Sequence, residues 1–189
     1  MGELLPNLII SGQVYSGKTE LAKVLADEYE YTVINTGQVL LSRLIDKYGD
    51  RDFTPAECEN ERDLIIVDEG PLYFLKTVPK DCPLVIDGVR SVKVQQALID
   101  LDYYQILLGA SKQDRLSRIN RETSSNKWKV SSIDELDHID KLQSTNLVNL
   151  GQRVDQCYIN SNEIDLKFLA RRIIEDSISF NQLNNSASS

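Results

Sequence analysis

The fold is decided by residues 8–25, LIISGQVYSGKTELAKVL, in which Gly12 and Gly17 stand five residues apart and are followed by Lys18 and Thr19. This is the spacing of a P-loop, a turn whose backbone N–H groups point at a phosphate while the next helix adds its positive dipole end. We expect Lys18 to reach the β and γ phosphates of a nucleotide and the Thr19 hydroxyl to hold Mg²⁺. The motif therefore predicts an ATP site with Mg²⁺, to which we assign Gly12, Ser16, Gly17, Lys18, Thr19 and Glu20.

The surroundings of the motif are those that a P-loop requires. Residues 7–10 have the character of a short buried strand, and residues 18–29 carry apolar side chains at the helical period, at Leu21, Val24 and Leu25. The alternative interpretation is a glycine-containing turn before an ordinary amphipathic helix. The order of strand, loop and helix favours the phosphate site.

Length and charge narrow the class of protein. The chain has 189 residues and a formal net charge of -8, so we expect one domain with a core of its own and no general affinity for nucleic acid or for an anionic membrane. Three scattered cysteines, Cys58, Cys82 and Cys157, suit reduced thiols better than a zinc cluster or disulfides. With no basic leader and no long apolar run, the sequence predicts a soluble cytoplasmic protein.

Strands and helices alternate along the rest of the chain. We expect strands over residues 31–35, 83–88, 103–109 and 157–160, and helices over residues 37–46, 54–70, 92–101, 112–121 and 163–176, with one more opening at Ser132. Such alternation predicts an α/β three-layer sandwich with a parallel five-stranded sheet, the P-loop nucleoside triphosphate hydrolase fold. We expect residues 1–180 to form a single domain with a short lid near 118–132, and residues 181–189 to form a disordered tail.

Two stretches could supply the carboxylate that a P-loop phosphotransferase needs near its metal. LIIVDEG ends in Asp68 and Glu69, like the acid pair of ATP-hydrolysing motors, whereas LVIDGVR contains Asp87 and Arg90. The first run lies between helix start signals at Thr54 and a stop at residue 70, which predicts a helix. The second run is bracketed by a proline and a glycine, which predicts a strand. We therefore favour Asp87, with Asp68 as the alternative.

Longer stretches resemble a known family. Residues 11–40 and 84–98, SGQVYSGKTELAKVLADEYEYTVINTGQVL and LVIDGVRSVKVQQAL, look like the P-loop small-molecule kinases, chiefly the nucleoside monophosphate kinases related to adenylate kinase, and also the dephospho-CoA-kinase-like branch. The resemblance implies that Asp87 lies near the metal and that Arg90 binds the phosphate of the acceptor. It also implies that Thr36 and Gly37 open the acceptor-binding helix.

The resemblance extends to a lid and a last strand. GASKQDRLSRINRE, residues 109–122, matches the strand and arginine-bearing lid of the family, and VDQCYIN, residues 154–160, resembles its last strand. Arg115, Arg118 and Arg121 recur every three residues, and we assign the catalytic lid role to Arg118 and Arg121, beside Lys18 and Asp87. The only histidine, His138, lies on a predicted acidic helix and is expected to be structural.

Departures from the adenylate kinase pattern separate the chain from that enzyme. Gln38 stands where the pattern has aspartate, Leu41 where it has an acceptor arginine, and Arg43 follows two places late. The function expected from the sequence is transfer of the γ-phosphoryl group of ATP to a nucleoside or deoxynucleoside monophosphate. The alternatives are a dephospho-CoA kinase and an ATP-binding regulatory switch. The sequence leaves the oligomeric state open.

Overall fold

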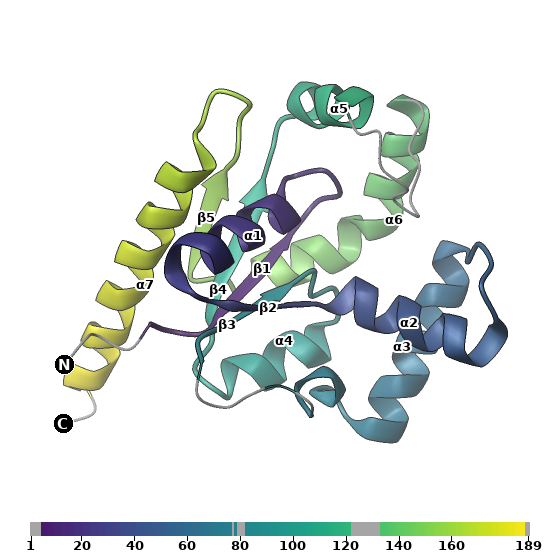
Figure 1. Ribbon diagram of the computed structural model, residues 1–189, viewed down its shortest axis with the longest axis horizontal. Helices are drawn as coiled ribbons and strands as arrows, with labels where there is room; N and C mark the ends of the chain where they lie inside the picture. Colours follow the sequence, from purple (N-terminus) through teal and green to yellow (C-terminus); the bar gives the residue numbers. More distant parts are fainter. Residues whose placement is uncertain (1–4, 77, 79–81, 122–132, 188–189) are drawn as a thin grey trace.

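A five-stranded parallel sheet forms the centre of the molecule (Figure 1). The structure is a computed structural model, and it describes residues 5–76, 78, 82–121 and 133–187. The strand order is β2-β3-β1-β4-β5, with every neighbouring pair parallel. The strands are β1 (Leu8–Gly12), β2 (Thr32–Asn35), β3 (Leu84–Asp87), β4 (Tyr104–Gly109) and β5 (Gln156–Ile159).

Helices cover both faces of this sheet, so the predicted three-layer α/β fold is confirmed. α1 (Lys18–Tyr29) and α7 (Leu166–Ala187) pack on one face, and α4 (Val92–Ile99) and α6 (Ile133–Gly151) on the other. α2 (Thr36–Tyr48), α3 (Pro55–Glu69) and the 3₁₀ turn η1 (Tyr73–Leu75) lie together at the β2 side of the molecule, and α5 (Lys112–Arg121) lies beside α6 (Figure 1).

The central strand shows why the sheet is covered on both sides. Successive side chains of a strand point to opposite faces, so Leu8 and Ile10 of β1 join the core beneath α1 and α7, while Ile9 joins the core on the other face. All three are fully buried. A strand that is buried on both faces reads as a continuous apolar run, which is the pattern that residues 8–10 have.

The segment that contains LIIVDEG is helical, as its flanking signals predict. Thr54 caps α3: its hydroxyl accepts a hydrogen bond from the Glu57 backbone N–H, and the Glu57 carboxylate accepts one from the Thr54 backbone N–H. Gly70 ends the helix with a φ of +88°, a conformation that glycine adopts without strain.

The last helix is longer than the sequence predicts. α7 starts at Leu166 and continues to Ala187, so residues 181–187 are helical where we expected a disordered tail. One reason is that the apolar contact with the sheet does not stop at Asp176, because the Phe180 ring packs edge-on against Tyr104 with centroids 5.3 Å apart. No helix within the described ranges is long and apolar enough to cross a membrane.

Candidate active site

The P-loop follows β1 at the carboxyl edge of the sheet, and close packing accounts for both of its glycines, against backbone at Gly12 and against a side chain at Gly17. Gly12 has a φ of +150°, and a Cβ on it would lie 2.1 Å from the Leu108 carbonyl oxygen. Gly17 has a φ of +92°, and a Cβ on it would lie 2.3 Å from Nδ2 of Asn160. A larger residue is therefore excluded at Gly12 by the β4 backbone, and is strained at Gly17 by the left-handed φ and the buried Asn160 amide.

Lys18 begins α1 and points across the loop. Its ammonium Nζ donates a hydrogen bond to the Gln13 carbonyl, at 2.6 Å. Desolvation lowers the pKa of Lys18 to about 8, and the nearby Asp87 carboxylate only partly offsets this. A phosphate beside the ammonium would favour its charged form, so the environment suits a lysine that gains its counter-charge from a ligand.

Asp87 ends β3 next to the loop and is 1% exposed. Its Oδ2 accepts hydrogen bonds from the Thr19 hydroxyl, at 2.8 Å, and from the Asn35 amide, at 2.6 Å. Its other oxygen, Oδ1, is buried without a hydrogen-bond partner among the described residues. A buried carboxylate oxygen of this kind is costly unless something binds it.

The residues present fit a magnesium ion bound together with nucleotide. Mg²⁺ prefers oxygen ligands and is usually held by one or two protein groups plus the phosphates of its substrate. Thr19 and Asp87 supply such oxygens, and Asp87 Oδ1 has a free coordination position. No cluster of three or more His, Cys, Asp or Glu side chains that could hold a metal by itself occurs in the part of the chain that the structure describes.

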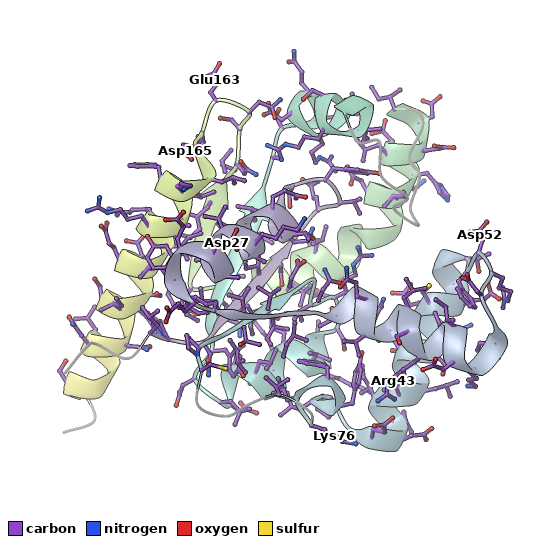
Figure 2. The ribbon with its side chains drawn as sticks, in the orientation of Figure 1. Asp27, Arg43, Asp52, Lys76, Glu163 and Asp165 are labelled. Atoms are coloured by element: carbon purple, nitrogen blue, oxygen red, sulfur yellow. The ribbon has the colours of Figure 1, made fainter. Side chains whose placement is uncertain are left out.

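The competing acids lie away from the loop. Asp68 is exposed near the end of α3. Glu69 pairs with Arg43 of α2 and with Lys76, and both cations lie in the part of the molecule formed by α2, α3 and η1 (Figure 2). The structure therefore places Asp87, and not Asp68, beside the P-loop. It also shows that Arg43 is engaged outside the cavity.

A cavity of about 600 Å³ opens in front of the loop. Thr36 and Gly37 line it at the start of α2, where the Thr36 hydroxyl donates to the carbonyls of Asp87 and Gly88, at 3.2 and 2.9 Å. The rest of the wall is Val14, Tyr15, Gly17, Lys18, Thr19, Glu20, Lys23, Asn35, Gln38, Leu40, Leu41, Phe53, Cys58, Arg62, Asp87, Gly88 and Arg90. The predicted nucleotide and acceptor residues thus share one cavity, except Gly12 and Ser16, which form the loop behind it.

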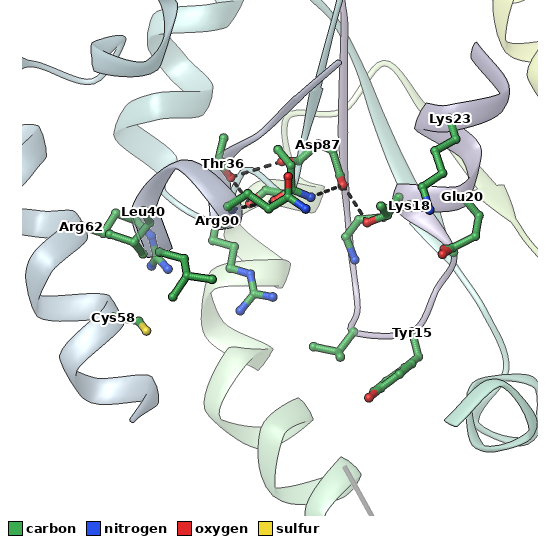
Figure 3. A pocket seen from close by; sticks show the side chains of 18 of the residues that line it. Tyr15, Lys18, Glu20, Lys23, Thr36, Leu40, Cys58, Arg62, Asp87 and Arg90 are labelled. Carbon is green, nitrogen blue, oxygen red and sulfur yellow. Dashed lines mark hydrogen bonds between the residues drawn. The ribbon is translucent and has the colours of Figure 1, made fainter. Parts of the chain in front are cut away.

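Two guanidinium groups line the cavity, and Figure 3 shows Arg90 between Arg62 and Lys18. Arg90 follows β3, as the sequence predicts, and Arg62 projects from α3. Burial and the positive charge of Arg62 lower the pKa of Arg90, so the two groups are close enough to repel each other. Arg62 was not identified from the sequence, because the local pattern of a polar helix does not indicate whether an arginine on it will face the cavity in the folded protein.

The three regularly spaced arginines of α5 have different environments. Arg115 is 2% exposed; it binds the Asp140 carboxylate through two hydrogen bonds, at 2.9 and 2.5 Å, and the Val14 carbonyl. Arg118 donates to the carbonyls of Tyr15 and Asn160, at 3.0 and 2.8 Å. Arg121 ends α5, and its side chain lies outside the described part of the chain, as do residues 122–132 of the predicted lid.

Asn160 contacts the P-loop from the end of β5. It is 3% exposed, and its Nδ2 donates to the Ser16 carbonyl at 2.8 Å. Together with Arg118 it fixes the backbone of the loop from the β5 side. No local pattern predicts this contact, since 144 residues separate the partners. His138 is exposed on α6.

The pair of Arg115 and Asp140 gives a stability prediction. We expect Asp140→Ala to lower the free energy of unfolding by about 3 kcal/mol, because it leaves the buried Arg115 charge without its partner. Urea unfolding followed by circular dichroism measures the change. The matched control is Asp137→Ala on the same helix, whose pair with Lys112 is exposed and should contribute less than ~1 kcal/mol. Equal shifts for the two variants would contradict a structural role for Arg115.

Comparison with known proteins relates the fold to solved structures. No protein-family model matches the sequence, and no curated protein does. Shikimate kinase from Acinetobacter baumannii in complex with shikimate superposes with a TM-score of 0.62 at 15% identity, covering 94% of this chain and 95% of that chain. A gluconokinase from Sinorhizobium meliloti 1021 superposes with a TM-score of 0.59 at 14% identity, covering 99% and 100%. The chain has the P-loop kinase fold. At these identities the likeness describes the architecture alone.

Proposed function

We propose that the chain is an ATP-dependent phosphotransferase that moves the γ-phosphoryl group of ATP to a nucleoside or deoxynucleoside monophosphate. The observation that carries the proposal is that one cavity has cations suited to anions at both ends. In Figure 3, Lys18 of the P-loop and Arg62 of α3 lie on opposite sides of the cavity, Arg90 lies between them, and Asp87 lies near Lys18. Arg62 and Arg90 are the cations in this cavity that an acceptor phosphate could bind beyond the P-loop.

Each residue then has a role that its position supports. The loop N–H groups and Lys18 bind the β and γ phosphates, and Thr19 and Asp87 would hold Mg²⁺, which supplies charge neutralisation at the transferred group. Arg90 binds the anionic group of the acceptor through the two parallel N–H bonds of its planar fork. Phosphoryl transfer depends mainly on positioning and on charge neutralisation, which this arrangement provides.

The lid arginines belong to the same proposal. Arg118 is held beside the loop through the Tyr15 carbonyl, where its charge can act on the transferred phosphoryl group. We assign the same role to Arg121, which follows on the same helix. Gly12, Ser16, Gly17 and Glu20 complete the proposed nucleotide site, and Thr36 and Gly37 the proposed acceptor site.

The wall of the acceptor end favours a monophosphate with a flat apolar body. Leu40, Leu41 and Phe53 line the same cavity, and Figure 3 shows Leu40 beside Arg62. A nucleobase can bury its faces against such side chains, whereas a polyhydroxylated acid such as shikimate or gluconate has no flat apolar body to bury there. The hydroxylated acids remain the second candidate, because solved structures of their kinases share the fold. A dephospho-CoA kinase would use the same loop and acids.

Arg90→Lys tests the acceptor site. We expect the variant to raise KM for the acceptor and to lower kcat, each by about tenfold, because lysine offers a point charge in place of a two-bond fork. ATP affinity should be nearly unchanged, since the P-loop contacts remain. Steady-state kinetics and calorimetric titration with ATP and with each monophosphate measure these effects.

The control is Arg171→Lys on the exposed surface of α7, which should behave as wild type. An Arg90→Lys variant with unchanged acceptor kinetics would show that Arg90 only supports the fold. If ATP binds both proteins equally and no monophosphate, dephospho-CoA or hydroxylated acid binds either, the chain is a nucleotide-binding switch instead.

A further inference from the structure

Asn35 uses both ends of its amide at the junction of the sheet and α2. It is the last residue of β2, directly beside Asp87 in the parallel register of β2 and β3. Its Nδ2 donates to Asp87 Oδ2 at 2.6 Å, and its Oδ1 accepts from the backbone N–H of Gln38 at 2.9 Å. The second bond makes Asn35 the N-cap of α2.

Only one orientation of this amide satisfies its neighbours. Rotating it by half a turn would place Oδ1 against the Asp87 carboxylate and the NH₂ group against the Gln38 N–H. Both contacts would then be repulsive. The side chain is therefore fixed by its hydrogen bonds, and so is the direction in which it donates.

The fixed orientation of the Asn35 amide determines where the unpaired oxygen of Asp87 points. Thr19 and Asn35 both donate to Oδ2, so the carboxylate is held from two sides while Oδ1 keeps no partner in the described structure. A single donor would leave the plane of the carboxylate free to turn about that contact. Two donors on different elements, α1 and β2, fix the plane and therefore the direction in which Oδ1 points.

We propose that Asn35 is a positioning residue that fixes the Asp87 carboxylate for the nucleotide-bound metal and ties it to the acceptor helix α2. Residues of α2 line the acceptor end of the cavity, including Gly37, Gln38 and Leu41. The proposal rests on the proposed function for its account of Asp87. On this proposal, the neutral side chain of Asn35 holds the metal-binding and acceptor-binding parts of the cavity in a fixed relative position.

The test uses Asn35→Ser, since serine can still cap α2 but is too short to reach Asp87 while doing so. The measured quantity is the affinity for ADP by calorimetry, in Mg²⁺ and in EDTA. We expect Asn35→Ser to reduce the Mg²⁺-dependent gain in affinity by about tenfold, as for a lost hydrogen bond to a charged group, with affinity in EDTA unchanged. In an Asp87→Asn background the same substitution should have no further effect.

Thr54→Ala is the control, because it removes the cap of the neighbouring helix α3 without touching Asp87. It should lower the melting temperature and leave ADP affinity unchanged. The proposal would be overturned if Asn35→Ser lowered ADP affinity equally in Mg²⁺ and in EDTA. It would also be overturned if Asn35→Ser lowered ADP affinity further in the Asp87→Asn background. The measurement needs no acceptor, so it can fail or succeed independently of which acceptor is phosphorylated.

Discussion

Asp87→Asn is expected to reduce phosphoryl transfer by about 10²-fold or more while changing the melting temperature little. The substitution keeps the shape of the side chain and removes the charge that faces the nucleotide-bound metal. Folding should tolerate it, because an amide oxygen can still accept from Thr19 or Asn35 and a buried charge has been removed. Coupled ADP-release kinetics and thermal unfolding measure the two effects.

Asp68→Asn is the matched control, since it removes the same charge from the competing acid on the exposed side of α3. We expect wild-type turnover from it. The opposite pattern, an active Asp87→Asn variant beside an inactive Asp68→Asn variant, would show that the acid pair in LIIVDEG serves the metal and that the proposed site is misplaced.

Lys18→Ala should lower turnover by about 10³-fold, because the charge aimed at the β and γ phosphates is lost in a partly dehydrated loop. Lys93→Ala removes an equal charge from the exposed face of α4 and should change nothing. Wild-type activity in Lys18→Ala would contradict the assignment of the P-loop as the nucleotide site.

The lowered pKa of Lys18 gives the same prediction a second measurement. With a pKa of about 8, a large share of the ammonium groups is neutral at pH 8, and ATP should restore the charge. Binding at pH 8 should therefore take up protons, and at pH 6, where Lys18 is already charged, this uptake should vanish. Calorimetry in buffers of different ionisation enthalpy measures the number of protons taken up on binding. In Lys18→Ala the extra uptake at pH 8 should be absent.

The parts of the site that the sequence predicted are those encoded within a few residues. The P-loop is one continuous motif, and the flanks of Asp87 separate a strand from a helix, so the structure agrees with the sequence at both places. The helix predicted to open at Gly37 begins one residue earlier, at Thr36, while the acceptor role of Thr36 and Gly37 came from the family resemblance and stays a prediction. The alternation of strands and helices likewise predicted the sheet.

The parts that were missed depend on contacts between distant segments. A spacing of three places Arg115 and Arg118 on nearby faces of a helix, but only the packing of α6 shows that Arg115 is buried against Asp140. Arg62 and Asn160 reach the site because their elements pack against it, which no local pattern records. The end of α7 was misjudged for the same reason, since Tyr104 of β4 supports it.

The most direct test of the proposed activity follows the γ-phosphoryl group itself. ATP labelled at the γ position is incubated with the chain, Mg²⁺ and, in separate reactions, each common nucleoside and deoxynucleoside monophosphate, dephospho-CoA, shikimate and gluconate. The account predicts that the label appears in a nucleoside diphosphate, with one ADP formed for each group transferred, and that Asp87→Asn abolishes the transfer. Label found only in dephospho-CoA or a hydroxylated acid product, or ATP bound with no acceptor labelled, would contradict it.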